Sequence, residues 1–512
     1  MADIKVSSVY EERVKTLLER EWGMLIGGEV VAARGGETIE TTSPADGRFL
    51  AKVPFAQRED VNQAVAAAKE AFPAWRKTPL VEKAARMRAF VRVLREHAEE
   101  LGILDAIDCG NPAKAMIGDV GMACGGLEYI SGVAMEVKGQ TLPSMGENWL
   151  LTRREPYGVV GRIVPFNHPI LFMAWKIGAP VMTGNTLVLK GPEQAPLSSM
   201  YLSEIMKDVF PPGVVNIICG DGPTTGDALV RHPEVKRIAL VGSVETGQRI
   251  QASAAEVGVK HVSLELGGKN PMIVFPDADL DEAVEAAAFG MNFHWCQGQS
   301  CGSTSRLFLH EEIHDEFLEK LIERVKKIRI GHPLDPETQM GCLVSKEHYE
   351  KVMGYVELGK KEGARLVHGG GKPEGEGFED GYFLAPTIFD DVTMEMRLAN
   401  EEIFGPVLSV LRWSDREKVI QEANAVEYGL TGAVWTTDIR TAFEVADALD
   451  TGYVWINGSG SHFLGAPFSG HKNSGTDSEE GIEELLSYTQ SKTVSIGLGA
   501  VKAKEPSRGG QA

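Results

Sequence analysis

The spacing of hydrophobic positions changes several times along the chain, and each change predicts a different kind of element. Residues 24–55 alternate short apolar runs with glycine and Asp-Gly turns, a pattern typical of a β-meander. From Asp60 onward, apolar residues recur three and four positions apart and predict a helix. Thr78 and Pro79 then resemble an N-cap followed by proline at the first helical position, so a second amphipathic helix is expected to run from there towards Glu100.

From about residue 157 the pattern becomes a repeated strand, turn and helix. A first series of strand candidates comprises Val159–Val164, Thr186–Lys190, Val214–Ile218, Arg237–Val241 and His261–Leu264. A second series begins near Met272 and includes Ser305–Leu309, Val407–Leu411, Ala433–Thr436 and Tyr453–Ile456. Strands that alternate with helices favour a doubly wound parallel sheet. The sequence therefore predicts an α/β fold with two such sheets and a boundary near Gly267 and Gly268.

Composition and charge narrow the class of protein. The chain has 512 residues, of which 43% are hydrophobic and 24% charged, as in ordinary globular proteins. A net charge of -20 makes nucleic acid and anionic membranes poor partners. Apolar runs fall short of the ~20 residues that span a bilayer, and the charged N-terminus does not resemble a signal peptide. Six cysteines without a CxxC pair favour a reducing compartment, so a cytoplasmic location is expected.

Cys301 is the first candidate for chemistry. It stands in the segment Gln297–Gly302 among small, flexible residues, which allow a substrate to approach the thiol. Because a free thiol has a pKa of about 8.5, a nucleophilic cysteine needs exposure, backbone NH donors and a nearby base. A structural cysteine is the commoner interpretation of such a residue taken alone, and Cys296 receives that interpretation.

Two further residues fit supporting roles. Glu265 ends an apolar strand before two glycines, where burial would raise its carboxyl pKa and suit a general base. The alternative is a salt-bridged glutamate at a strand end. Asn167 lies in the turn Pro165–Pro169, where its amide could donate to a developing oxyanion. The alternative for Asn167 is an Asx-turn.

Two glycine-containing segments follow strands. The segment Gly242–Gly247 lies between a strand and a helix, where glycines let a pyrophosphate approach a helix N-terminus. The segment Gly220–Gly226 is nearer to the GxGxxG spacing, but its second interval is one residue too long, and a tight turn is the preferred interpretation.

His310 and His314 satisfy the HExxH pattern of zinc proteases. That chemistry needs both histidines on one face of a helix. Residues 306–310 are predicted to form a strand, and the next helix is expected to begin only around Glu311. A metal site is therefore not expected, although a zinc hydrolase remains an alternative function.

Taken together, these segments resemble the aldehyde dehydrogenase superfamily, in its NAD(P)-dependent, non-acylating, hydrolytic type. The resemblance extends from about Met24 to about Val494. Further segments that carry it are Gly184–Lys190 with Gly191-Pro192-Glu193, Glu401–Val407, Pro467–Gly475 and Tyr488–Lys492. Each segment is moderately specific, and their number and order make the joint match very specific.

The resemblance implies a reaction order. Cys301 attacks the aldehyde carbon, and the Asn167 amide with the Cys301 backbone NH holds the oxyanion of the thiohemiacetal. Hydride passes to the nicotinamide and leaves a thioester. Glu265 then activates the water that releases the acid. Relatives that acylate coenzyme A lack this glutamate, so hydrolytic release is expected.

The resemblance also implies a cofactor site. Lys190 and Glu193 are expected at the adenosine ribose, and a carboxylate there repels a 2′-phosphate, so NAD is favoured over NADP. The complete set of implied cofactor-binding residues is Val164, Pro165, Phe166, Lys190, Glu193, Gly242, Ser243, Gly247, Leu266, Glu402 and Phe404. Glu479 falls where the family has a glutamate proposed to relay protons.

Five residues match the family's substrate tunnel: His168, Phe172, Trp175, Trp295 and Phe463. An aromatic tunnel suits an apolar or aromatic aldehyde, which is the first expectation. A betaine-like aldehyde is the alternative, since aromatic rings attract a quaternary ammonium. No arginine near these segments offers a clamp for a substrate carboxylate, so a semialdehyde acid is disfavoured.

The family's organisation implies a Rossmann-like NAD-binding domain, a catalytic domain and a small β-arm for oligomerisation. The NAD-binding domain is assigned to residues 1–132 and 153–266, and the catalytic domain to residues 267–481. Residues 133–152 and 482–500 are assigned to the arm, and residues 501–512 to a tail. A homodimer or homotetramer is expected. A non-catalytic binding protein on the same scaffold is the remaining alternative, because folds are reused without their chemistry.

Overall fold

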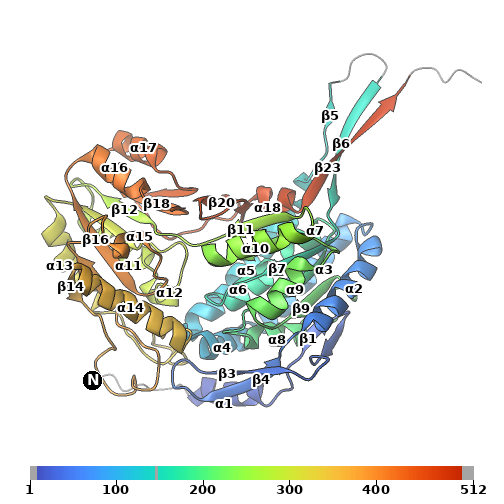
Figure 1. The fold of residues 1–512 in the computed structure, drawn as a ribbon, viewed down its shortest axis with the longest axis horizontal. Helices are drawn as coiled ribbons and strands as arrows, with labels where there is room; N and C mark the ends of the chain where they lie inside the picture. The colour runs from blue at the N-terminus through green and yellow to red at the C-terminus, as the bar shows by residue number, and fades with distance from the viewer. Residues whose placement is uncertain (1–7, 144–147, 499–512) are drawn as a thin grey trace, which may run out of the picture.

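The structure, a computed structural model, describes residues 8–143 and 148–498 (Figure 1). Two large sheets, each with its own helices, make up the body, and a narrow ribbon of strands projects away from it (Figure 1). The predicted α/β class with two parallel sheets is confirmed. In the described part of the chain, no helix combines the length and the apolarity that a membrane crossing requires.

The first sheet has the strand order β11-β10-β7-β8-β9-β1-β2. Neighbours from β11 to β9 run parallel, whereas β1 and β2 are antiparallel additions at one edge. The strands are β1 (Met24–Ile26), β2 (Glu29–Val31), β7 (Val159–Ile163), β8 (Thr186–Lys190), β9 (Val215–Ile218), β10 (Val235–Val241) and β11 (His261–Glu265). All residues of β8 and β9 are buried, as expected for parallel strands covered on both faces.

The helices of the first unit all precede β11 in the chain. They are α1 (Ser8–Leu18), α2 (Arg58–Trp75), α3 (Leu80–Glu96), α4 (Ala98–Cys109), α5 (Ala113–Val133), α6 (Pro169–Trp175), α7 (Gly178–Met182), α8 (Leu197–Ile205), α9 (Asp227–Arg231) and α10 (Val244–Val257). The predicted start of the second helix was off by one position. Pro79 occupies the N-cap of α3, and the Thr78 hydroxyl donates to the Ala74 carbonyl instead of capping the helix.

The β-meander predicted for residues 24–55 is wrong. Its four strands form two separate hairpins. β1 and β2 join the edge of the first sheet, where Leu25 pairs with Ile217. β3 (Thr38–Thr42) and β4 (Phe49–Pro54) form a two-stranded sheet of their own. The turn residues indicate hairpins correctly, but packing against the distant strand β9 decides which strands become neighbours.

The second sheet has the order β14-β15-β16-β13-β12-β18-β19, in which only the pairing of β14 with β15 is antiparallel. Its strands are β12 (Pro271–Val274), β13 (Arg306–His310), β14 (Arg365–His368), β15 (Thr387–Asp390), β16 (Val407–Trp413), β18 (Thr431–Trp435) and β19 (Tyr453–Ile456). Its helices are α11 (Leu280–Gly290), α12 (Phe293–Cys296), α13 (His314–Val325), α14 (Lys346–Glu362), α15 (Arg397–Asn400), α16 (Arg416–Asn424) and α17 (Ile439–Ala448).

The projecting ribbon is a three-stranded antiparallel sheet of β5 (Thr141–Leu142), β6 (Asn148–Pro156) and β23 (Thr489–Gly497), with β6 in the middle (Figure 1). The last part of the chain also contains β17 (Tyr428–Gly429), β20 (Phe468–Ser469), β21 (His471–Lys472), β22 (Ser478–Glu479) and α18 (Ile482–Ser487). α18 packs against α5 and α7 of the body. Residues 482–487, assigned to the arm from the sequence, are thus a helix at its base.

A buried cluster of charges fastens this C-terminal segment to the first sheet. The guanidinium of Arg162, on β7, forms an ion pair with Glu479 and donates a 2.6 Å hydrogen bond to the Tyr488 hydroxyl. Lys176 lies 2.6 Å from the second oxygen of Glu479, and Glu484 lies within 4.0 Å of both cations. Because these cations surround it, the pKa of Glu479 falls to about 2 although burial opposes the charge.

Removing one partner from a buried charge cluster leaves the others uncompensated. We therefore expect Arg162→Met to reduce the free energy of unfolding by about 3–5 kcal/mol, measured from the midpoint of urea unfolding. The exposed Arg249 pairs only with Glu245 on the surface of α10, so Arg249→Met is the matched control and should cost less than about 1 kcal/mol. Equal midpoints for the two variants would contradict the stabilising role of the cluster.

Candidate active site

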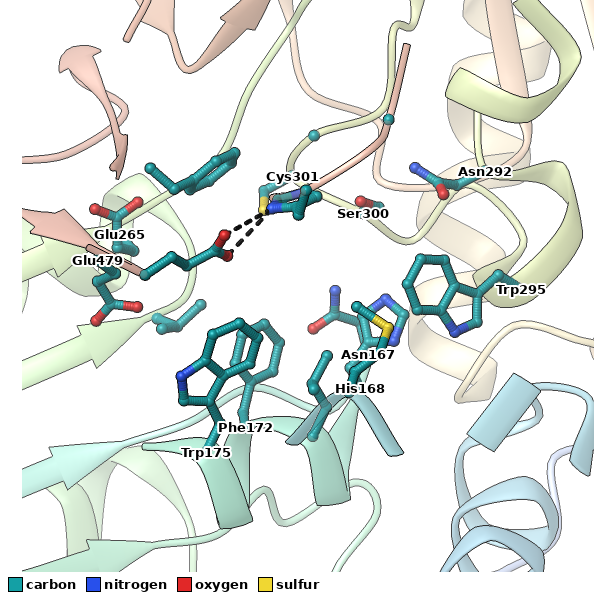
Figure 2. Close-up of a pocket in the computed structure, with 18 of the residues that line it drawn as sticks. Asn167, His168, Phe172, Trp175, Glu265, Asn292, Trp295, Ser300, Cys301 and Glu479 are labelled. Atoms are coloured by element: carbon teal, nitrogen blue, oxygen red, sulfur yellow. Dashed lines mark hydrogen bonds and ion pairs between the residues drawn. The ribbon is translucent and has the colours of Figure 1, made fainter. Parts of the chain in front are cut away.

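A cavity of about 880 Å³ is lined by residues of both sheet units, and Figure 2 shows its walls. It brings together three residues singled out from the sequence, Asn167, Glu265 and Cys301, although these lie far apart along the chain. Its full lining is Met122, Asn167, His168, Leu171, Phe172, Trp175, Lys176, Val241, Glu265, Asn292, Trp295, Ser300, Cys301, Gly302, Trp455, Gly460, His462, Phe468, Glu479 and Glu480. Most of this wall is aromatic or aliphatic.

Cys301 occupies a turn that is fixed from behind. The Asn270 side chain donates a 2.7 Å hydrogen bond to the Cys301 carbonyl, and a Cβ at Gly268 would collide with the same carbonyl. Cys301 lines the cavity and is only partly exposed, and desolvation raises the pKa of its thiol to about 12, with Glu402 and Glu265 adding to the effect. The sulfur is therefore a protonated thiol near neutral pH and needs a proton acceptor to become a nucleophile.

The chain that leads to this turn is strained. Asn292, Trp295 and Gln297 all have positive φ angles, which non-glycine residues rarely adopt. Such angles cost on the order of 1–3 kcal/mol each and persist where the surrounding structure imposes them. They turn the chain from Asn292 to Cys301 inward, so that Trp295 and Cys301 both line the cavity.

Glu265 is the last residue of β11 and is buried at the cavity wall. Neither of its carboxylate oxygens has a hydrogen-bond partner among the described residues, so the salt-bridged alternative is wrong. Burial raises the pKa of this carboxyl well above its usual value, and the negative charge of Glu479 raises it further. A carboxyl group in this setting can take up a proton near neutral pH.

Asn167 follows β7 and is held against the loop that carries the thiol. Its side-chain Nδ2 donates a 2.9 Å hydrogen bond to the Gln299 backbone carbonyl. Its backbone carbonyl accepts a 2.8 Å hydrogen bond from the Asn111 side-chain amide. The side chain thus bonds across the cavity floor and not to its own turn, which replaces the Asx-turn interpretation. One amide N–H remains to serve a group placed beside Cys301.

Four of the five predicted tunnel residues line the cavity: His168, Phe172, Trp175 and Trp295. The fifth prediction, Phe463, is wrong, because its side chain is 63% exposed at the surface. Its neighbour His462 lines the cavity instead and packs on Phe468, with ring centroids 4.8 Å apart. Glycines at 460 and 465 bound this turn, and its conformation, which the sequence did not specify, decides which aromatic residue faces inward.

A second cavity, of about 640 Å³, adjoins the first, and Asn167 and Cys301 line both. Seven of the predicted cofactor residues line it: Pro165, Phe166, Gly242, Ser243, Leu266, Glu402 and Phe404. Four more lining residues were not predicted: Val241, Gly267, His348 and Lys351. Val164, Lys190, Glu193 and Gly247 lie outside this lining. His348 has no distinguishing sequence signal, since it lies on α14 at an ordinary helical position.

The second cavity has the features that a dinucleotide needs. The backbone of α10 begins beside it, and Ser243 caps this helix by accepting a 3.2 Å hydrogen bond from the Thr246 N–H. A Cβ at Gly247 would meet the Leu266 side chain, so glycine lets the helix approach β11 closely. Glu402 accepts a 2.8 Å hydrogen bond from the Gly268 N–H, and burial raises its pKa to about 7. The N-terminus of α10 with Ser243 fits a phosphate, and the Glu402 carboxyl group fits a ribose hydroxyl.

Lys190 and Glu193 form an ion pair of 2.8 Å beyond the end of β8. Lys190 is buried, whereas the Glu193 side chain is 34% exposed. This ion pair therefore lies at the carboxyl edge of the first sheet, the edge at which doubly wound sheets bind ligands.

The HExxH pattern does not form a metal site. β13 ends at His310 and α13 begins at His314, so the predicted change from strand to helix is confirmed. The His314 ring is buried between Asp390 at 2.9 Å and Asp315 at 2.8 Å, while the His310 ring packs on Trp413. Within residues 8–143 and 148–498, no group of three or more His, Cys, Asp or Glu side chains is arranged so that it could hold a metal ion.

Comparison with known proteins gives one consistent result. The aldehyde dehydrogenase family model matches residues 30–494. Aldehyde dehydrogenase tropH of Talaromyces stipitatus is 46% identical over 467 residues, which are 90% of each chain. The NAD+ complex of an aldehyde dehydrogenase from Bacillus cereus superposes with a TM-score of 0.92 at 41% identity, covering 97% of this chain and 100% of that one.

A second solved structure has the same fold. It is the indole-3-acetaldehyde dehydrogenase AldA of P. syringae, in complex with NAD+ and IAA, with a TM-score of 0.93 at 37% identity. The match covers 96% of this chain and 100% of that one. The family match over nearly the whole length, together with the two adjoining cavities that share one cysteine, leads to a single conclusion: the chain belongs to the aldehyde dehydrogenase family.

Proposed function

We propose that this NAD-dependent aldehyde dehydrogenase oxidises its aldehyde through a covalent thioester on Cys301. The observation that carries the proposal is the position of Cys301, which lines both the aromatic cavity and the cavity suited to a dinucleotide. An aldehyde bonded to this sulfur would have its carbonyl carbon at the junction of the two spaces. A non-catalytic binding protein has no need for a thiol there.

Each residue around the sulfur has its own role in the proposed mechanism. Cys301 gives up its proton to solvent, as the one net proton that the overall reaction releases, and attacks the carbonyl carbon. The Asn167 amide N–H and the Cys301 backbone N–H hold the resulting oxyanion. Bound NAD supplies a hydride acceptor. Once the thioester has formed, the Glu265 carboxylate takes a proton from water, which attacks the thioester and releases the acid and the Cys301 thiol. The absence of an ion partner leaves Glu265 free for this proton.

Cofactor binding in this proposal involves the second cavity and, outside its lining, the end of β8. The N-terminus of α10, with Gly242 and Ser243, receives the pyrophosphate. Glu402 holds the nicotinamide ribose, and Phe404 packs beside the ring. Lys190 and Glu193 hold the adenosine ribose, where the Glu193 carboxylate repels a 2′-phosphate and so favours NAD over NADP.

The substrate in this proposal is an apolar or aromatic aldehyde, because Phe172, Trp175 and Trp295 dominate the wall. The P. syringae relative acts on an aromatic aldehyde by its name. A betaine-like aldehyde is the second candidate, since the aromatic rings of the same wall attract a quaternary ammonium. A cytoplasmic location, expected from the six free cysteines, belongs to the same proposal.

We further infer that the ribbon of β5, β6 and β23 joins this chain to a second copy. β23 is a long strand with one unpaired edge, and such edges readily pair with another chain. Exposed apolar side chains on the ribbon are Trp149 of β6, Ile496 of β23 and Leu498 directly after β23. With its ribbon paired, the enzyme is a homodimer, or a homotetramer built from two such pairs.

The first prediction concerns the nucleophile. Cys301→Ala should abolish formation of reduced nicotinamide, followed by absorbance with NAD and a panel of aromatic, aliphatic and betaine-type aldehydes. Cys296→Ala is the control, because this buried cysteine lies five residues away and should leave turnover intact. If Cys301→Ala were as active as the wild type, another residue would be the nucleophile. If the wild type bound NAD and oxidised no aldehyde, the binding-protein alternative would gain.

The second prediction concerns Glu265. Glu265→Gln should lower steady-state turnover by about 10²–10⁴-fold, the usual contribution of a general base, while a rapid burst of about one reduced nicotinamide per site remains. The base form is the deprotonated one, and burial raises the pKa of Glu265. Wild-type turnover should therefore increase with pH from neutral upward, and the variant should lose this increase. A variant without a burst would place Glu265 before hydride transfer.

The third prediction concerns assembly. Light scattering should give the wild type a mass two or four times the chain mass of 55.5 kDa. Trp149 and Ile496 are cross-strand partners, so the double variant Trp149→Glu with Ile496→Lys keeps a favourable pair within the ribbon but removes its apolar surface. This variant should have a lower mass. Ile439→Lys, on the exposed face of α17, is the control and should not change it. A monomeric wild type would refute the inference.

A further inference from the structure

One wall of the aromatic cavity contains a buried carboxylate that holds two of its rings. Asp119, on α5, has a fully buried side chain. Its Oδ2 lies 2.8 Å from Nδ1 of His168, and its Oδ1 accepts a 2.9 Å hydrogen bond from the Trp295 indole N–H. His168 precedes α6 in the first unit, and Trp295 belongs to the strained segment before Cys301. One carboxylate therefore fixes parts of the wall that come from two separate units.

This bond determines how the imidazole faces the cavity. Because a carboxylate only accepts hydrogen bonds, Nδ1 of His168 carries a hydrogen, and the Nδ1–H tautomer of the ring presents Nε2 as an acceptor. The ring packs between Trp295 and Phe172, with centroid separations of 4.8 and 6.2 Å, and Figure 2 shows it beside Asn167 in the cavity. Among the described residues, none hydrogen-bonds to Nε2.

An acceptor in an aromatic wall discriminates between substrates. An aldehyde that covers Nε2 with methyl or methylene groups breaks the hydrogen bond between Nε2 and water and forms no other. A substrate hydroxyl replaces that hydrogen bond. A hydroxyl both donates and accepts, so it pairs with Nε2 whether or not the imidazole is protonated.

We propose that His168, oriented by Asp119, is a subsite that binds a hydroxyl group on the aldehyde substrate. The proposal rests on the aldehyde oxidation argued above and names the substrate class of that cavity more closely: an aromatic aldehyde that carries an alcohol. His168 contacts the substrate, and Asp119 is a positioning residue that acts through the tautomer of His168.

The test uses six aldehydes that carry one of three substituents of nearly equal size: the meta and para isomers of hydroxymethyl-, ethyl- and methoxybenzaldehyde. With wild-type enzyme and NAD, kcat/KM for a hydroxymethyl isomer should exceed that for the matching ethyl compound by about tenfold, the value of one hydrogen bond. The methoxy compound accepts but does not donate, so it should resemble the ethyl compound or be poorer.

Two variants separate the subsite from simple packing. His168→Phe removes Nε2 but keeps a ring, and should reduce the hydroxymethyl advantage to about onefold while the ethyl compound is still oxidised. Asp119→Asn places an amide N–H opposite Nδ1, so the other tautomer is favoured and Nε2 becomes a donor. This variant should increase the methoxy rate relative to the ethyl rate by several-fold. A merely structural role of Asp119 would lower the rates for all three substituents together.

Trp295→Phe is the matched control, since it removes the second hydrogen bond of Asp119 and leaves His168 in place; it should keep the hydroxymethyl advantage. Equal rates of the wild type for the three substituents would overturn the proposal, as would an advantage that survives in His168→Phe. If no aldehyde at all were oxidised, the proposed function would fail instead, so the two failures are distinguishable.

Discussion

Removal of water from the junction of the two sheets is the constraint on which the rest of the site depends. The Cys301 thiol, the Glu265 carboxyl and the Glu402 carboxyl all lie there, and in each case desolvation is the largest influence on the pKa. The same desolvation keeps the thiol protonated and makes the carboxyl groups basic. Transfer of the thiol proton to a carboxylate still costs free energy, because the pKa rises to about 12 for Cys301 and only to about 7 for Glu402, whereas a carboxyl group with a raised pKa suits acid–base chemistry near neutral pH.

The neighbouring carboxylates show that burial alone does not decide a protonation state. Glu265 and Glu479 line the same cavity and are both buried, yet their pKa values shift in opposite directions. Glu479 has Arg162 and Lys176 against it, whereas Glu265 has no cation in contact. Two acidic groups in one space thus differ because of their partners, and this difference is the reason why proton transfer is proposed for Glu265 and an electrostatic anchoring role for Glu479.

The sequence predicted the elements that local spacing determines and missed those set by distant contacts. The parallel strands from β7 to β13 follow from apolar runs between turn residues, and Cys301, Glu265 and Asn167 could be found because each lies within two residues of a glycine or proline. β14 and β15 were not predicted, because each has an apolar run of only two residues. Phe463 faces solvent because of a loop conformation, and Asp119 was not singled out, because only the fold brings its helix against His168 and Trp295. Sequence patterns show which residue types are available, whereas a network across three segments exists only in space.

The cluster around Arg162 also affects how the chain can reach this fold during its synthesis. Arg162 meets Glu479 and Tyr488 across sequence separations of 317 and 326 residues. While the ribosome extends the nascent chain, the first sheet therefore carries an unneutralised guanidinium in a place that the finished protein keeps dry. Contacts between such distant segments form late and slowly, and incomplete intermediates expose apolar surface. The first sheet to be made is thus among the last parts to become complete, because it closes only after residues 479–488 have left the ribosome.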